Sequence, residues 1–290
     1  MERLLIVAVL TAVIHLISTL AYSVRLSGVR TRRLATAISL FNVVFLLAST
    51  ANTIQAPLLS SIIEQVINEV KAQAGGGLPD DQLFYLPAYQ EGLLLLEQDI
   101  RVVLAAASLG TLAGIAVIPT FVHIFIIAIL SFERCGSVPR LIGMLILSPR
   151  RMVNLSRQVY LPGKNSLGFV KERRAAIPKK FLFLNVIVTG VYTTGVLSAI
   201  YAGALFPEFR STAALLSSVV NGIATILSAT VVDPTAAAIT DDALKGERSE
   251  QDVKKMVLYL SLTRFLGTVL AQLIFLPATY FIKYVAVLLA

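Results

Sequence analysis

The sequence predicts an all-α integral membrane protein with six transmembrane helices, and three observations carry this prediction. Of the 290 residues, 56% are hydrophobic and only 14% are charged, and the mean hydropathy is +0.79. Several apolar runs reach the roughly 20 residues that cross a bilayer as a helix. Two short motifs also recur in the same order in both halves of the chain, which favours a 3+3 inverted-topology repeat.

Composition argues against a water-soluble domain. A soluble protein of this length could not hide so much apolar surface, because a large share of any folded surface must face solvent. A lipid-exposed segment must satisfy its own backbone hydrogen bonds, so the apolar runs are expected to be helices. The net charge of +8 does not indicate nucleic-acid binding, because the basic residues gather in particular loops beside the apolar runs.

The apolar runs give the six spans in order. They are residues 4–24, 34–63, 102–132, 181–205, 212–232 and 256–289. The first run is too long for the apolar core of a signal peptide, so we expect it to remain as the first span. The chain then divides into a three-helix repeat at 1–132, a connecting segment at 133–180 and a second three-helix repeat at 181–290.

The charges of the connecting segments predict the orientation. Four arginines and no acidic residue follow the first span, namely Arg25, Arg30, Arg32 and Arg33. The 64–101 loop carries seven acidic and two basic residues, whereas 133–180 carries eleven Lys or Arg and two acidic residues. Because cytoplasmic loops hold the excess of Lys and Arg, we expect these basic segments inside and both termini outside. The 233–255 segment, also expected inside, has four basic and six acidic residues and adds little.

Part of the basic cytoplasmic segment has a second interpretation. Residues 150–161 mix three arginines with apolar side chains. Such a stretch can lie in the headgroup layer as an interfacial helix, with its cations toward anionic phospholipids. The same arginines also fit the ordinary excess of Lys and Arg in a cytoplasmic loop. Both interpretations stay open.

The predicted repeat depends on two motifs. The second and fifth spans share Ser-x-x-Asn followed by Ser, at Ser39, Asn42 and Ser49 and at Ser218, Asn221 and Ser228. The third and sixth share Leu-Gly-Thr and a later proline, at 109–111 with Pro119 and at 266–268 with Pro277. With three spans in each half, the second half enters the membrane upside down, as in transporters whose substrate sites lie between repeats. Chance matches between helices rich in small residues are the alternative.

The chain lacks the residue patterns of the common hydrolases and nucleotide-binding proteins. It contains no HExxH, GxSxG or P-loop motif and no paired carboxylates within a span. His15 and His123 occur singly in the first and third spans, where a histidine more often bonds to a neighbouring helix than to a metal. We therefore predict a protein that is not an enzyme and has no cofactor or metal.

Polar side chains within two spans are the first candidates for substrate binding. The second span is unusually polar for a lipid-facing helix, and several of its polar residues fall on one helical face. Such a face either holds neighbouring helices together or lines a hydrated cavity. The candidates are Asn42, Ser49, Asn52 and Gln55, with Asn221 and Ser228 from the matching motif of the fifth span.

Charged residues near the cytoplasmic side are the second group of candidates. Arg264 lies about 10 Å inside the sixth span, where burial costs at least about 2.5–3.5 kcal/mol, so partners or water are expected. Its side chain either snorkels to the cytoplasmic surface or faces a cavity and attracts an anion. Asp233, at the end of the fifth span, is expected to be its nearest carboxylate. Arg25, Arg30 and Arg33 either set the topology or form a cationic rim where a phosphorylated lipid enters from inside.

The N-terminal part of the chain resembles the Amj family. The resemblance lies in LAYSVRLSGVRT at 20–31, SLFN at 39–42 and ANTIQAPLL at 51–59, and extends through the six-span layout and the Val-Asp-Pro at 232–234. Amj proteins are bacterial lipid II flippases, the alternates to MurJ. The resemblance implies that this protein moves undecaprenyl-pyrophosphate-linked peptidoglycan precursor from the inner to the outer leaflet of the cytoplasmic membrane. The resemblance does not assign a functional role to any particular residue.

The resemblance and the basic segment together indicate the expected partners. Lipid II and anionic phospholipids are the expected partners, and peptidoglycan-synthesis proteins are further candidates.

Other functions stay open. One alternative is an exporter of another polyprenyl lipid or of a small solute, which predicts the same topology. Another is a non-transporting membrane scaffold of cell-wall synthesis, which would tolerate loss of Asn42, Asn52 and Arg264 but not changes to 133–180. A channel is disfavoured, because no ring of acidic residues or filter-like run occurs.

Overall fold

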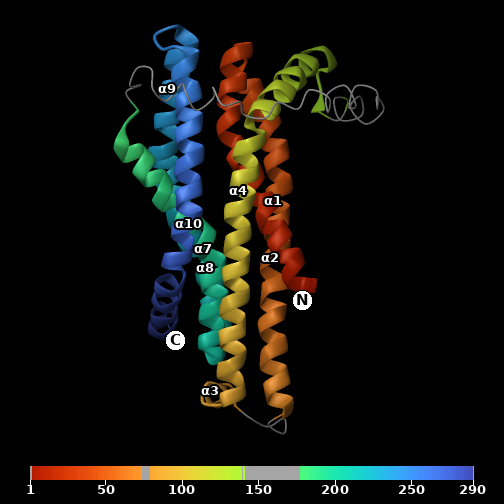
Figure 1. The fold of residues 1–290 in the computed structure, drawn as a ribbon, viewed down its shortest axis with the longest axis vertical. Helices are drawn as coiled ribbons and strands as arrows, with labels where there is room; N and C mark the ends of the chain where they lie inside the picture. The colour runs from red at the N-terminus through yellow and green to blue at the C-terminus, as the bar shows by residue number, and fades with distance from the viewer. Residues whose placement is uncertain (1, 74–78, 139, 141–176, 290) are drawn as a thin grey trace.

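The computed structural model describes residues 2–73, 79–138, 140 and 177–289, and in this part of the chain the secondary structure is entirely helical. Six helical runs are long and apolar enough to cross a membrane, which confirms the prediction. They are α1 (Glu2–Thr31), α2 (Leu34–Gln73), α4 (Pro87–Cys135), α7 (Lys179–Leu205), the run Pro207–Lys245, and α10 (Glu250–Leu289). The helices run up and down side by side along one long axis (Figure 1). The suggested interfacial helix at 150–161 lies outside the described residues.

The fifth run is interrupted near its middle. It consists of η3 (Pro207–Phe209), α8 (Arg210–Leu227), the π-helical turn η4 (Ser228–Val232) and α9 (Asp233–Lys245). Pro234 has no N–H to donate to the backbone four residues earlier, so the α-helical ladder cannot continue unchanged through this point. A single π turn is the usual way in which a helix absorbs such a change of register, and such turns are frequent at functional sites. The helix continues to Gly246, where a positive φ ends α9.

The connection expected as a loop over 64–101 is largely helical, and here the structure differs from the prediction. Helix α2 continues to Gln73, the short α3 covers Asp80–Leu83, and α4 begins at Pro87. With 40 and 49 residues, α2 and α4 are about 60 and 74 Å long, roughly twice the thickness of the hydrocarbon layer. Glu, Gln, Lys and Leu are good helix formers, so the helices continue after the apolar pattern ends.

Each half of the chain packs around its own first helix. In the first half α1 packs against α2 and α4, and in the second half α7 packs against α8 and α10. The glycine of each Leu-Gly-Thr motif lies at one of these crossings. A Cβ on Gly110 would collide with the α1 backbone at Ala12, and one on Gly267 would lie 2.6 Å from the Thr189 side chain of α7. This agreement is what two repeats would produce, and the inverted repeat itself stays a prediction.

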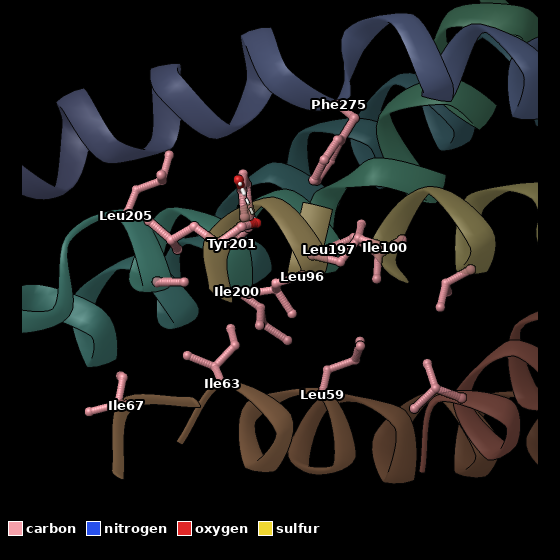
Figure 2. Packing of buried hydrophobic residues seen from close by; sticks show 14 of the residues in the cluster. Leu59, Ile63, Ile67, Leu96, Ile100, Leu197, Ile200, Tyr201, Leu205 and Phe275 are labelled. Atoms are coloured by element: carbon pink, nitrogen blue, oxygen red, sulfur yellow. Dashed lines mark hydrogen bonds between the residues drawn. The ribbon is translucent and has the colours of Figure 1, made fainter. Parts of the chain in front are cut away.

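An apolar cluster holds the two halves together toward the end of the bundle at which α3 lies. Figure 2 shows Leu59 and Ile63 of α2 facing α4 and α7, with Phe275 of α10 on the far side. Two buried tyrosines tie the cluster to the backbone. The hydroxyl of Tyr89 donates to the carbonyl of Ala204 at 2.7 Å, and that of Tyr201 donates to the carbonyl of Leu93 at 3.2 Å. This end of the bundle is therefore closed by apolar packing.

Packing at the opposite end, where α9 lies, is different. One cluster there joins α1 and α4 to α7, α9 and α10, and another joins α1, α2 and α4. Neither of these two clusters contains residues of both α2 and the second half. Among the residues that the structure describes, the seam between α2 and the second half is therefore packed with apolar side chains toward the α3 end but not toward the α9 end.

Candidate functional site

A cavity of about 410 Å³ lies between the two halves of the bundle, lined by α1, α2, α7, α8 and the η4 turn, with Arg264 of α10 in its wall. It brings together most of the residues that the sequence singled out. Those that line it are Ser49, Asn52, Gln55, Asn221, Ser228, Asp233 and Arg264. The polar face of the second span and the motif of the fifth thus meet in one place, as expected of a hydrated cavity wall.

Four predicted residues do not line the cavity. Asn42 is exposed near the start of α2 and lies away from it. The three arginines are held by carboxylates of other helices. Arg30 donates two hydrogen bonds to Glu250 at 2.8 and 2.9 Å, Arg33 pairs with Glu133, and Arg25 pairs with Asp233. The expected cationic rim is therefore largely neutralised by acidic side chains.

Arg264 has no carboxylate partner in the described part of the chain. The ion pair that involves Asp233 joins it to Arg25, with 3.9 Å between Nη2 and Oδ1, so the expectation that Asp233 pairs with Arg264 is wrong. The Nε of Arg264 is buried and makes no hydrogen bond to a described residue. A half-buried cation in a cavity wall, with its Nε buried and no carboxylate partner among the described residues, can bind an anion, because an unpaired charge there is costly.

Three further polar side-chain atoms of the described residues are buried without a hydrogen-bond partner. One, Asp80 Oδ1, is in an ion pair with Lys71 at the α3 end. The other two belong to residues that line the same cavity. They are Nδ1 of His15 and Oδ1 of Asn221. Buried polar groups in proteins are nearly always hydrogen-bonded, so a group of unsatisfied atoms around one cavity indicates that water or a ligand completes the bonds. The sequence analysis expected His15 to bond to a neighbouring helix, but its Nδ1 has no such bond.

Other polar side chains of the wall make hydrogen bonds that hold helices together. The amide of Asn185 on α7 donates to Thr263 Oγ1 at 2.9 Å and to the Leu260 carbonyl at 3.0 Å, and Tyr22 of α1 donates to its oxygen at 2.9 Å. Gln55 of α2 donates to Thr11 of α1 at 2.7 Å. Sequence reasoning missed Asn185 and Tyr22, although a lone Asn within an apolar span could have drawn attention to the first.

Helix packing is sparse on the side of the cavity between α2 and α8. Helix α2 packs against α1, α4 and α7, and α8 packs against α7 and α10, so the two helices face each other across the cavity without extensive contact among their described residues. Ser49 and Asn52 line the cavity and are nevertheless exposed. Leu197 belongs both to the cavity wall and to the apolar cluster, which therefore closes the cavity toward the α3 end.

The site has the features of a binding cavity. Among the residues that the structure describes, no group of three or more His, Cys, Asp or Glu side chains could hold a metal ion. The wall combines one unpaired guanidinium with hydroxyl, amide and imidazole groups. Such groups can bind a ligand that carries both negative charge and neutral polar groups.

Comparison with known proteins gives a family match over nearly the whole chain. The model of the family described as "Amj: Alternate to MurJ" matches residues 10–286. A protein of Bacillus subtilis (strain 168) named "Lipid II flippase Amj" is 34% identical over 272 residues, which cover 93% of this chain and 92% of the relative. No solved structure matches.

Proposed function

The chain belongs to the Amj family, and we propose that it is a lipid II flippase of the bacterial cytoplasmic membrane. The observation that carries this proposal is the relative named "Lipid II flippase Amj", which matches over almost the full length of both proteins. The proposed activity is transport of undecaprenyl-pyrophosphate-linked peptidoglycan precursor from the inner to the outer leaflet. On this proposal the protein is a transporter rather than an enzyme.

The cavity supports the proposal because it suits the physical task. A sugar-peptide-pyrophosphate head crosses hydrocarbon slowly without help, since each unpaired polar group there costs several kcal/mol. The polar cavity can hold part of the head, and the prenyl tail is proposed to leave between α2 and α8, which pack sparsely, and to remain in lipid. At about 410 Å³, the cavity suits a small-molecule-sized part of the head, so the peptide is expected to lie outside it.

Arg264 is the proposed binding group for the pyrophosphate. Its guanidinium lines the cavity, and its Nε has no hydrogen-bond partner among the described residues. A guanidinium binds phosphate oxygens in a planar, two-bond geometry. Arg25 lies at the edge of the same cavity through its ion pair with Asp233, and it is proposed to meet the head group on entry. The other wall candidates contribute neutral hydrogen bonds.

The difference in apolar packing between the α3 end and the α9 end of the bundle gives a direction to the proposed transport. The α9 end carries 25–33, which the positive-inside rule assigns to the cytoplasm, so the termini are proposed to lie outside. In this orientation the apolar cluster closes the cavity toward the outside, and the proposed state is one that loads from the inner leaflet. With the inside negative, each net negative charge moved outward gains about 2.3 kcal/mol per 100 mV, so flipping can proceed without ATP.

Partners beyond lipid II belong to the same proposal. The basic connecting segment at 133–180 is proposed to lie against anionic phospholipids of the inner leaflet, because each Lys or Arg near such a surface contributes about 1 kcal/mol. Peptidoglycan-synthesis proteins that consume lipid II on the outer face are proposed to keep the reaction running outward.

The test is rescue of a bacterial strain depleted of its own lipid II flippase. Wild-type protein should restore lipid II labelling at the outer leaflet, and Arg264→Ala should abolish it while the protein still reaches the membrane. Arg264→Lys, which keeps the charge but not the planar two-bond geometry, should retain part of the activity. Arg3→Ala, at an exposed arginine away from the cavity, serves as the matched control. Normal outer-leaflet labelling with Arg264→Ala would remove Arg264 from the mechanism.

A further inference from the structure

His15 is buried in the cavity wall and is not used by the proposed pyrophosphate contact. Only 7% of the residue is exposed, and its Nδ1 makes no hydrogen bond to any described group. The bond near it, from Thr19 Oγ1 to the His15 carbonyl at 2.7 Å, involves the backbone and leaves the imidazole free. A nitrogen kept without a partner in a polar cavity is expected to bond to whatever fills the cavity.

Arg264 and His15 face the same space from different helices. Both line the cavity, from α10 and α1 respectively. A neutral imidazole has one donor and one acceptor nitrogen, so in either tautomer its free nitrogen can pair with a hydroxyl or an amide. Phosphate oxygens without protons only accept. A ligand that carries an anionic group next to a hydroxyl or amide group satisfies both side chains whichever nitrogen of His15 holds the proton, whereas a bare phosphate satisfies Nδ1 only when that nitrogen is protonated.

The other side chains of the cavity wall also favour a ligand that contains a sugar. In the described part of the cavity wall, Asp233 and Arg264 are the charged side chains, and the other polar ones are neutral hydroxyl, amide, phenol or imidazole groups. A site for bare pyrophosphate would instead gather several cations and backbone N–H groups around the phosphates. The chemical class that fits one cation surrounded by neutral hydrogen-bonding groups is a glycosyl phosphate.

We propose that His15 contacts the sugar next to the phosphate and lets the cavity distinguish glycosylated polyprenyl pyrophosphates from polyprenyl pyrophosphate alone. This inference rests on the proposed function and adds a specificity-determining residue to it. Arg264 holds the phosphate that all such lipids share, and His15 bonds to a hydroxyl or acetamido group that only the glycosylated lipid carries. Selectivity then arises in the cavity, before any movement across the membrane.

The experiment measures binding of two lipids to the purified full-length protein in nanodiscs. The probes are lipid II and undecaprenyl pyrophosphate, with affinity read by native mass spectrometry or thermophoresis. Wild-type protein is expected to bind lipid II more tightly. His15→Phe should weaken lipid II binding about tenfold, as expected for one buried hydrogen bond, and should leave undecaprenyl pyrophosphate binding unchanged. His15→Gln, which restores a neutral hydrogen-bonding group, should recover part of the loss.

A matched control separates recognition from folding. His123 is on α4 and does not line the cavity, so His123→Phe should leave both affinities unchanged. Thermal unfolding of each variant in detergent reports on the fold. Equal affinity of His15→Phe and wild type for lipid II, or an equal loss for both lipids, would overturn the role of His15. Failure of the wild-type protein to bind either lipid would instead overturn the proposed function.

Discussion

The carboxylate of Asp233 lies 3.9 Å from the guanidinium of Arg25, across the boundary between the two three-helix halves. Asp233 follows the π turn, lines the cavity, and has 61% of its side chain exposed, whereas Arg25 has 18% exposed. Ser228 donates a further hydrogen bond to the carboxylate at 3.3 Å. The pair therefore neutralises a cation at the edge of the cavity, at the point where an anionic head group is proposed to enter.

Asp233→Asn should increase the affinity for an anionic lipid. The substitution removes a negative charge from the cavity wall and leaves Arg25 without its carboxylate, so lipid II binding to the purified protein should become several-fold tighter. The fold should change little, because the Asp233 carboxylate is mostly exposed and lies 3.9 Å from the guanidinium, and a pair with a solvated partner contributes about 0.2–1 kcal/mol. Arg25→Gln should act in the opposite direction on binding. Weaker binding by Asp233→Asn would contradict the assigned role.

Gly195 and Asn221 should show energetic coupling. A Cβ on Gly195 of α7 would collide with the amide oxygen of Asn221 on α8, so Gly195→Ala must push the two helices apart or displace the amide. We expect a loss of about 1–3 kcal/mol in the free energy of unfolding, measured in detergent with a denaturant. Asn221→Ala removes the obstacle, and the double variant should recover much of the loss.

The control for this pair is another glycine of the same region. A Cβ on Gly222 of α8 would meet nothing within 4 Å, so Gly222→Ala should stabilise the protein by about 0.5–1 kcal/mol through helix propensity. Additive effects of Gly195→Ala and Asn221→Ala would mean that the two residues do not touch.

Asn185→Leu should destabilise the helix packing. The Asn185 side chain takes part in three hydrogen bonds that join α7 to α1 and α10, and it is 2% exposed. Hydrogen bonds between membrane helices contribute about 0.6 kcal/mol on average and up to about 2, so a loss of about 1–3 kcal/mol is expected from thermal or denaturant unfolding. Asn42→Leu, at an exposed position outside the cavity, is the matched control and should have little effect. Equal stabilities for the two variants would refute the bridging role.

The apolar cluster should keep external reagents out of the bundle. In a Cys135→Ser background, Ser49→Cys should react with a membrane-impermeant thiol reagent added from the cytoplasmic side, because Ser49 lines the cavity and is exposed. Ile200→Cys, which is buried in the cluster, should not react from either side. Adding Tyr89→Phe removes the hydrogen bond to Ala204 and should increase labelling of Ile200→Cys from outside.

Two results would overturn this account of the closed end. Rapid labelling of Ile200→Cys from outside without the Tyr89 substitution would mean that the cluster does not seal the bundle. Labelling of Ser49→Cys from the outer side alone would reverse the proposed orientation, because the open part of the cavity would then face outward.

The fold and part of the site could be predicted because they depend on local pattern. Six apolar runs predicted six helices, and the polar spacing in the second span predicted a helical face that includes Ser49 and Asn52, which both line the cavity. The same reasoning misjudged the 64–101 connection, since hydropathy marks where a helix leaves lipid and not where it ends. It also grouped Asn42 with Ser49, although only the second reaches the cavity.

The amino-acid pattern alone was enough to predict the six membrane helices, the polar character of the second and fifth spans and the resemblance to the family. The pairing of Asp233 with Arg25 rather than Arg264, and the position of His15 in the cavity wall, became visible only in the folded structure. The reason is geometric. Hydropathy reports how long a helix is, whereas these contacts depend on how each helix is rotated about its axis and on which neighbour it packs against.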